Sequence, residues 1–248
     1  MGATRTFFGT PSIPSAFASL VAKSISACLQ TLGNVVVFGT QPVLVSRLLH
    51  TLLLFVPPSL RWQCQRPAAK ADFCPYGRLQ TLKKSSLSTF LSESASSHWP
   101  WALIDVDRSV VVVSAPFHKH RILKKRTDLA AVNSILGRPT DSTNRKIDLS
   151  RCPPLPEVTS FLRRMAMLPV EDSARLGFVE QFNLCVENEA RAFIALPSEY
   201  DKSHASRSAS FSLPAVRKAL DLNNEGWFSS VLARAESLQP EISQFVYM

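Results

Sequence analysis

Two histidines separated by one residue are the first candidates for chemistry in this sequence. On a strand, His118 and His120 would lie on the same face, where two imidazoles could share a metal ion. Their neighbours Lys119 and Arg121 are cations that would repel a metal. The pattern therefore predicts a solvated basic loop and no metal site.

The glycines and carboxylates exclude several common catalytic motifs. All eight glycines stand at least six residues apart, whereas phosphate-binding loops need closely spaced glycines that let the backbone approach a phosphate. Neither Gly-x-Ser-x-Gly nor His-Glu-x-x-His occurs. On a helix, Glu187 and Glu189 do not face each other, and Glu180 lies roughly 10 Å from Glu187. We therefore expect a protein that is not an enzyme and that uses no cofactor.

The densest positive charge lies between residues 118 and 126. This basic patch holds five cations, Lys119, Arg121, Lys124, Lys125 and Arg126. Such a patch suits contacts with RNA phosphates or a nuclear import signal. Proteins that bind single-stranded RNA interleave aromatic residues with basic ones for base stacking, and only Phe117 lies nearby. A positively charged surface turn is the simpler interpretation.

The charge is unevenly distributed along the chain. The sequence has 28 Lys and Arg against 19 Asp and Glu, a formal net charge of +9. Residues 1–71 hold six basic residues and no acidic one, whereas residues 151–248 hold ten basic and twelve acidic residues. The basic character belongs to the first three-fifths of the chain, because residues 72–150 also hold twelve basic and seven acidic residues. This indicates an anionic partner, with solvated surface charge as the alternative. The five scattered cysteines lack a Cys-x-x-Cys spacing and indicate free thiols in a reducing compartment.

The acid-free start of the chain is similar to an organelle transit peptide. We treat residues 1–40 as a basic N-terminal segment and residues 41–248 as one α-rich domain. The apolar stretch over 43–56 is too short for a membrane span and contains Arg47 and His50. The sequence therefore predicts no stable membrane span.

The spacing of apolar residues predicts a mostly helical α+β fold. Helical periodicity covers residues 15–32, 42–55, 155–168, 176–193, 214–222 and 227–238. Four consecutive valines predict a β-hairpin, with strands over 102–106 and 109–115 that turn near Asp107 and Arg108. Periodicity is lost over 62–97, which we interpret as a linker or weak helix. The expected fold is a single domain with a small central antiparallel β-hairpin.

A proline-broken corner follows the second predicted helix. Val56-Pro57-Pro58-Ser59-Leu60 ends this helix and is followed by Pro75. A break of this kind would place Leu60 and Trp62 at an exposed corner, as in short docking motifs that present anchors to a groove. The alternative is a helix terminator with a buried leucine.

With these pieces together, the chain resembles the RNA-silencing suppressors that poleroviruses encode at the 5′ end of their genomes. That family carries an F-box-like pattern of Leu-Pro-x-x-Leu or Ile followed by Pro. Val56, Pro57, Leu60 and Pro75 fit this pattern, with Val in place of the first Leu and fourteen residues before the last Pro.

Two other segments extend the resemblance along the chain. Trp101 stands ahead of the valine strand like the family's Trp-Gly-Leu-Leu segment, and the second segment resembles its C-terminal apolar-Pro-Ser-Glu stretch through Leu196, Pro197 and Glu199. The resemblance implies an adaptor that suppresses host RNA silencing. Pro57 and Leu60 would bind the Skp-type subunit of a cullin ubiquitin ligase, and other surfaces would deliver Argonaute for degradation in the host cytoplasm or nucleus.

Two alternatives stay open at this point. The first is a basic RNA-binding or nuclear protein that uses the patch over 118–126. The second is an organelle-targeted protein that loses about its first 40 residues on import.

Overall fold

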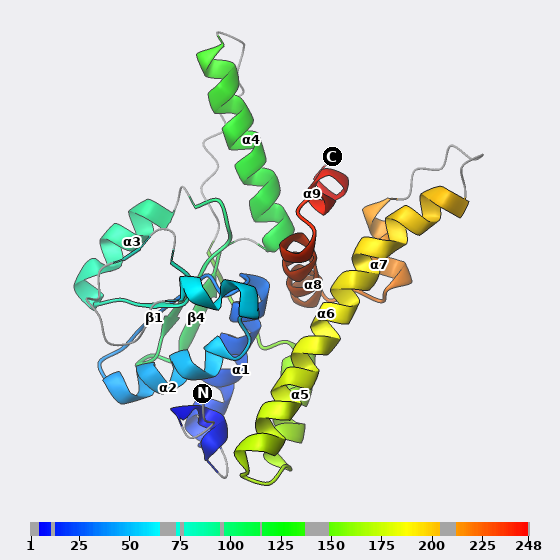
Figure 1. Cartoon of the computed structure of the whole chain (residues 1–248). Helices are drawn as coiled ribbons and strands as arrows, with labels where there is room; N and C mark the ends of the chain where they lie inside the picture. The colour runs from blue at the N-terminus through cyan, green and yellow to red at the C-terminus, as the bar shows by residue number, and fades with distance from the viewer. Residues whose placement is uncertain are drawn as a thin grey trace.

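The chain folds into a five-stranded mixed β-sheet with helices on both faces (Figure 1). The computed structural model describes residues 5–10, 13–64, 73–74, 77–94, 97–114, 116–136, 149–203 and 212–247. The strand order is β2-β1-β3-β4-β5. The strands are β1 (Val35–Phe38), β2 (Gln80–Thr81), β3 (Ala102–Asp105), β4 (Val110–Val113) and β5 (Ser150–Arg151).

Strand direction changes across the sheet. β1 is parallel to both β2 and β3, in the register Val36 opposite Gln80 and Val36 opposite Leu103. β3 and β4 form an antiparallel hairpin, in which Ile104 lies opposite Val111, and β5 continues it antiparallel to β4. The parallel pair requires a crossover, and α2 and α3 lie in the chain between β1 and β3.

The alternation of side chains along the strands builds two cores. On one face, alternate strand residues such as Val35, Val37 and Ile104 join the main core. On the other face, Val36 and Phe38 join a smaller core with Leu82, Phe90, Trp101 and Leu103. Because both faces are covered, β1 can be a continuous run of apolar residues.

Nine α-helices lie within the described residues. They are α1 (Ser15–Gln30), α2 (Pro42–Leu53), α3 (Leu87–Ser94), α4 (Phe117–Ile135), α5 (Pro156–Ala166), α6 (Asp172–Ser203), α7 (Leu213–Ala219), α8 (Glu225–Leu238) and α9 (Ile242–Val246). Three 3₁₀ turns accompany them, η2 (Phe7–Gly9), η3 (Pro58–Gln63) and η4 (Lys84–Ser86). None of the helices described is both long and apolar enough to cross a bilayer.

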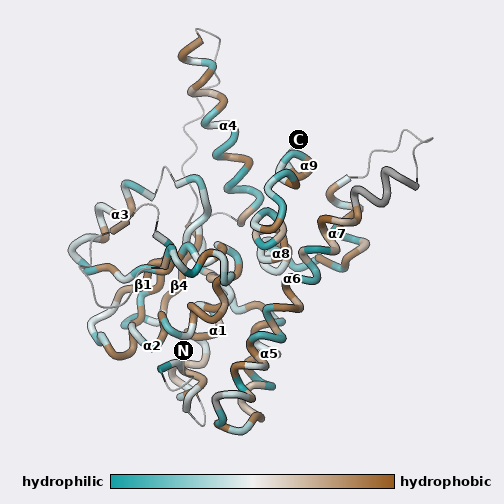
Figure 2. The backbone as a smooth tube through the Cα atoms, viewed as in Figure 1, coloured by the Kyte–Doolittle hydropathy of each residue, from teal (hydrophilic) through white to brown (hydrophobic). Residues whose placement is uncertain are grey.

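Helices α3 and α6 lie on opposite sides of the sheet, and α4 projects away from the rest of the structure (Figure 1). The projecting half of α4 carries several hydrophobic positions along its length (Figure 2). Helix α1 packs against β3 and β4 on one side and against α2, α5 and α8 on others. From Leu20 to Gln30 nearly every residue of α1 is buried, so this helix is the centre of the main core.

The predicted fold class is confirmed. The chain is mostly helical and α+β, and the valine hairpin forms as β3 and β4. The hairpin is part of a larger sheet, because β1, β2 and β5 extend it on both sides. The weak helix expected within residues 62–97 forms as α3. The division of the chain at residue 40 stays a prediction, and α1 and β1, which precede it, both pack in the main core.

The basic patch over 118–126 is not a surface turn. It forms the first half of α4. His118 and His120, which would share a face only on a strand, therefore point in different directions. The imidazole of His120 is buried and bonds the carbonyl oxygen of Ser97 at 3.0 Å, and burial lowers the pKa of His120 to about 4. His118 Nε2 lies 3.4 Å from a carboxylate oxygen of Glu225.

Arg121 of this patch is a structural residue. Its side chain is 13% exposed and pairs with Glu236 of α8, whose side chain is 3% exposed. The Arg121 guanidinium also lies 4.4 Å from the ring centre of Trp99, and the Tyr247 hydroxyl donates to Glu236 Oε2 at 2.9 Å. Lys119, Lys125 and Arg126 are exposed, and Lys124 pairs with Asp128 on the same helix at 2.8 Å.

Removing the carboxylate of Glu236 should therefore destabilise the fold strongly. In Glu236→Ala, the Arg121 cation stays buried without its counterion, and we expect the free energy of unfolding to fall by about 3 kcal/mol or more. Asp128→Ala is the matched control, because it breaks an exposed pair on the same helix and should cost about 0.5 kcal/mol or less. Urea unfolding followed by circular dichroism measures both; equal losses would contradict the structural role of Arg121.

Candidate functional site

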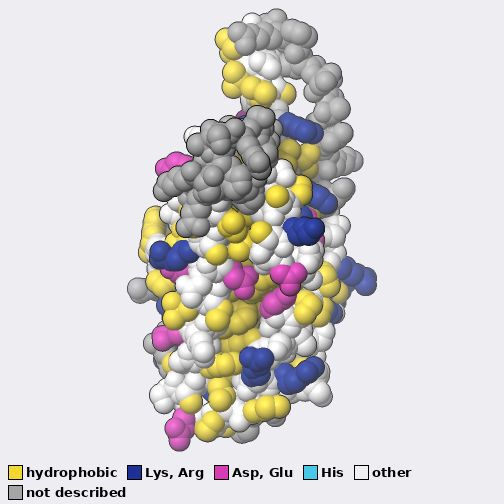
Figure 3. Space-filling view, turned by 90° about the vertical axis from the view of Figure 1, so that its right-hand side faces the viewer, with side chains coloured by type: hydrophobic (Ala, Val, Ile, Leu, Met, Phe, Trp, Pro, Cys, Tyr) yellow, Lys and Arg dark blue, Asp and Glu magenta, His cyan; other side chains and the backbone are white. Residues whose placement is uncertain are grey.

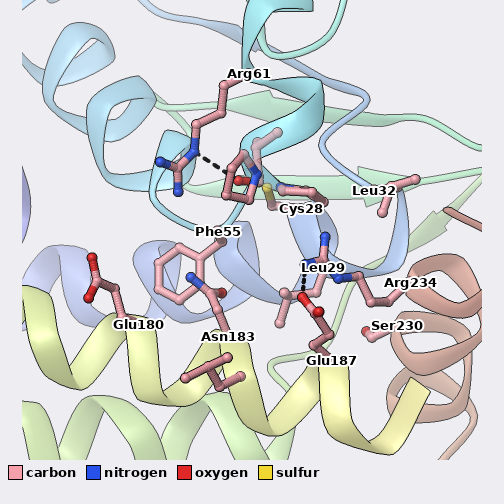
Figure 4. Close-up of a pocket in the computed structure, with 14 residues that line it drawn as sticks. Cys28, Leu29, Leu32, Phe55, Arg61, Glu180, Asn183, Glu187, Ser230 and Arg234 are labelled. Carbon is pink, nitrogen blue, oxygen red and sulfur yellow. Dashed lines mark hydrogen bonds and ion pairs between the residues drawn. The ribbon is translucent and has the colours of Figure 1, made fainter. Parts of the chain in front are cut away.

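A cavity of about 330 Å³ opens where α1, the end of α2, α6 and α8 meet (Figure 4). Its apolar lining includes Leu29, Leu32, Phe55, Val56, Pro57, Pro58 and Leu184. Its polar lining includes Cys28, Arg61, Glu180, Asn183, Glu187, Ser230 and Arg234. An apolar floor with a few polar groups at the edge is typical of ligand pockets and of the centres of protein interfaces.

The corner after α2 forms the floor of this cavity. Pro57 and Pro58 cannot continue the helix, and the chain turns into η3 at Pro58. Val56 is 1% exposed and packs against the turn after α1, where Gly33 has a φ of +79°. A Cβ at Gly33 would lie 2.8 Å from Val56 Cγ2. The corner and the end of α1 therefore hold each other in place.

Polar side chains satisfy carbonyl groups at and just beyond the end of α2. Arg61 Nε donates to the Val56 carbonyl oxygen at 3.0 Å, and Arg61 Nη2 donates to that of Leu54 at 3.3 Å. Asn183 of α6 donates to the same Leu54 oxygen at 2.9 Å. The last carbonyls of a helix lack partners within the helix, so these contacts tie α6 to the corner.

Charged residues link α6 and α8 beside the cavity. Glu187 accepts from Arg191 at 2.8 Å and pairs with Arg234 (Figure 4). The hydrogen bond from Arg191, followed by that from Arg234, holds the pKa of Glu187 below its usual value. Glu187 is therefore ionised at neutral pH and joins two helices.

The cysteine in the cavity is not suited to nucleophilic chemistry. Cys28 is buried, and its Sγ lies 3.7 Å from the carbonyl oxygen of Leu52. Burial raises the pKa of the Cys28 thiol far above its usual range. A thiol is reactive as the thiolate, so Cys28 acts as a small apolar residue in this wall.

The surroundings of the cavity expose large apolar side chains. Trp62 on η3 is 80% exposed and Leu184 on α6 is 58% exposed. Figure 3 shows hydrophobic side chains gathered along the face that carries α5 and α6, with acidic and basic side chains beside them. Trp62 does not line the cavity but directly follows Arg61, which does. Exposed tryptophan and apolar side chains are typical of a surface that binds another protein.

The structure brings only part of the predicted docking motif to this site. Val56 and Pro57 are buried in the wall of the cavity, and Leu60 is half-buried against the main core. The motif therefore does not present these side chains outward as the sequence suggested. Pro75 lies outside the described residues.

The other predicted segments lie elsewhere in the fold. Trp101 is buried in the second core, and its Nε1 donates to the Ser94 carbonyl oxygen at 3.1 Å. Leu196 is half-buried on α6, and Pro197 and Glu199 belong to the same helix. The expected terminal motif is therefore a continuation of a long helix. Neither Trp101 nor Leu196 is among the residues that line the cavity.

Comparison with known proteins points to a different family from the one suggested by short motifs. Residues 3–120 match the C9orf72-like protein family. Over 246 residues the chain is 27% identical to the guanine nucleotide exchange factor C9orf72 of Homo sapiens, an alignment that covers 90% of this chain and 50% of the relative. The homologues of Rattus norvegicus and Mus musculus are each 26% identical over the same extent. The chain thus spans about half the length of the curated relatives it matches.

These similarities overturn the prediction of a viral silencing suppressor. The F-box-like pattern depended on a few residues, two of which are buried here, whereas the new similarity extends over 246 residues. The Skp-type ligase subunit and Argonaute are therefore wrong as partners. Exchange factors act on GTPases as regulators, so these relatives are compatible with the prediction that the chain is not a classical enzyme.

Sequence reasoning located the corner of the site but missed its other wall. Asn183, Glu187 and Arg234 come from helices far along the chain, and Glu187 and Arg234 are 47 residues apart. The apolar periodicity of α6 predicted that the helix packs, without showing against what. The sequence placed Trp62 at an exposed corner after the proline break, and the structure finds this side chain exposed.

The ion pairs of Glu187 make a pH-dependent contribution to stability. Because the folded pKa of Glu187 is depressed, this stabilisation is present above the unfolded pKa and is lost as pH falls through the folded value. Glu187→Gln should reduce the free energy of unfolding at pH 7 by up to about 1 kcal/mol. The difference from wild type should shrink as the pH is lowered below about 4. Urea midpoints at pH 7, 5 and 3 measure this, and a constant difference would contradict it.

Proposed function

We propose that this chain is a C9orf72-like protein that takes part in guanine nucleotide exchange by binding a small GTPase. The observation that carries the proposal is the similarity over 246 residues to proteins named guanine nucleotide exchange factors. The chain corresponds to about half of the length of those relatives. We therefore propose above all that it binds a GTPase, and in addition that this binding contributes to nucleotide exchange.

Exchange requires binding energy and no covalent step. An exchange factor accelerates GDP release by binding the nucleotide-free GTPase more tightly than the GDP-bound form. The two effects are linked: the exchange factor lowers the affinity of the GTPase for GDP by a certain factor, and GDP lowers the affinity of the GTPase for the exchange factor by the same factor. A surface with apolar anchors, and without a nucleophile or acid–base pair, is sufficient for this activity.

The surface that suits this role is the cavity together with η3. Trp62 supplies a large exposed aromatic anchor, and Leu184 supplies apolar area on the neighbouring helix α6. Arg61 and Glu180 place opposite charges beside the cavity. Interfaces of this composition concentrate their binding energy in a few aromatic and arginine residues.

The proposal predicts a preference for the nucleotide-free GTPase. The full chain should bind a panel of small GTPases immobilised in their nucleotide-free, GDP-bound and GTP-bound forms, and for the cognate GTPase the nucleotide-free form should bind at least about tenfold more tightly. Release of a fluorescent GDP analogue measures exchange directly. Equal binding of all three forms by every GTPase tested would exclude the proposed function.

Replacing Trp62 should weaken this binding without unfolding the chain. Trp62→Ala removes an exposed anchor, so we expect a roughly tenfold or greater loss of affinity for the GTPase. Val43→Ala is the matched control, because Val43 is also exposed, at 70%, but lies at the start of α2. If both variants bind as wild type does, the partner surface lies elsewhere.

A further inference from the structure

A second hollow surrounds Trp99, on another part of the chain. Two adjoining cavities of about 490 and 390 Å³ share Arg78, His98 and Trp99 in their linings. Phe73, Phe90 and Trp101 supply aromatic surface to the larger one. The hollow shares Leu32 and residues of η3 with the GTPase surface proposed above, but Trp62, Leu184 and Glu180 do not line it.

Arg78 is the unusual residue in this hollow. It is only 9% exposed. Its Nε donates to Gln63 Oε1 at 2.7 Å, and its Nη1 donates to the Leu32 carbonyl oxygen at 2.6 Å. These contacts fix the guanidinium in one orientation. Burial lowers the pKa of Arg78, but an arginine side chain stays protonated in proteins, so a positive charge remains in the cavity wall.

No carboxylate of the described residues pairs with Arg78. The ion pairs within those parts of the chain do not include it, and its Nη2 has no hydrogen-bonding partner there. Arg78 lines both adjoining cavities, so its side chain borders open space. A buried cation without a paired carboxylate is costly unless an anion reaches it.

Arg121, which lies over the same tryptophan ring as Arg78, differs from it in having a carboxylate partner. Both guanidiniums contact the ring of Trp99, Arg121 at 4.4 Å and Arg78 at 6.0 Å from the ring centre. Arg121 pairs with Glu236 of α8, whereas Arg78 is held by an amide and a backbone carbonyl. The fold thus supplies a counterion to one of the two cations and leaves the other facing the cavity.

The side chains that line the cavity indicate which kind of ligand it could bind. A guanidinium offers paired donors in a plane, which match the two oxygens of a carboxylate. Beside it, the partly buried rings of Phe73 and Trp99 line the same cavity and suit a flat apolar group. Among the described residues that line the larger cavity, Arg78 is the one arginine or lysine, which matches a ligand with a single carboxylate.

We propose that this cavity binds a small organic monocarboxylate with an aromatic body, whose carboxylate pairs with Arg78 and whose ring lies against Phe73 and Trp99. Arg78 Nη2 and the second hydrogen of Nη1 donate to the carboxylate oxygens. Gln63 holds the guanidinium through Nε and thereby orients it. Binding here does not depend on the proposed exchange activity.

Indole resonances provide a direct test with the full chain. The sequence has four tryptophans, of which Trp99 and Trp101 line the cavity and Trp62 and Trp227 do not. We would titrate 3-phenylpropanoate into ¹⁵N-labelled protein and follow the indole N–H signals, assigned by Trp62→Phe and Trp227→Phe. Only the signals of Trp99 and Trp101 should shift.

Two analogues separate the contributions of charge and ring. The alcohol 3-phenylpropan-1-ol lacks the charge and acetate lacks the ring, and each should bind roughly tenfold or more weakly than 3-phenylpropanoate. Equal affinity for the acid and the alcohol in wild-type protein would overturn the assignment of Arg78. Equal affinity for acetate would overturn the aromatic part of the proposal.

Variants provide the second test. Arg78→Met should abolish the shifts, whereas Arg191→Met, which removes an arginine from an exposed ion pair on α6, should leave them unchanged. If Arg78→Met does not fold, Arg78→Lys keeps the charge without the paired donors and should still lower the affinity at least severalfold. Undiminished binding by the folded Arg78 variant would overturn the proposal.

Discussion

The burial of α1 on all sides is the constraint on which the rest of the structure depends. One side of this helix packs against β3 and β4, and its other sides pack against α2, α5 and α8. Close approach requires small residues, and Ala22, Ser24, Ser26 and Ala27 are all buried. Ser26 accepts a hydrogen bond from the backbone N–H of Leu155 at 2.9 Å, so the start of α5 is fixed directly to α1. A helix of larger side chains would separate the sheet from the C-terminal helices.

This arrangement explains why the candidate site lies at the C-terminal end of α1. Cys28, Leu29 and Leu32 line the cavity at this end of α1, and the corner after α2, α6 and α8 supply the rest of its lining. The segment that matches the C9orf72-like family, residues 3–120, contains α1, the sheet strands β1 to β4 and the corner after α2. Helices α6 and α8 lie beyond it. The proposed binding surface is therefore formed by both halves of the chain, and changes in either half would alter it.

The sequence predicted those features that depend on local patterns. The helices with regular apolar spacing and the valine hairpin form where expected, because burial on one face leaves a periodic trace. β1 was missed because it has four residues and is apolar on both faces, which gives no alternation to detect. The first half of α4 was interpreted as a basic loop because its charges dominate its composition. Arg121 can be buried because it pairs with Glu236, which lies 115 residues away in the sequence. A local sequence pattern cannot predict such a pairing.

The net positive charge of the chain has in part a structural explanation of a related kind. Arginines that appear in the sequence as unpaired charge are used in the fold as multiple donors to backbone carbonyls. Arg61 bonds two carbonyls at the end of α2, and Arg175 bonds those of Phe8 and Leu168, which joins the N-terminal turn to the start of α6. Because a guanidinium has five donors and a fixed geometry, one side chain can secure two loops at once. The basic excess of this chain therefore reflects in part how it ties loops together. The anion site that we propose lies at Arg78, because this buried cation lines a cavity and pairs with no carboxylate of the described residues.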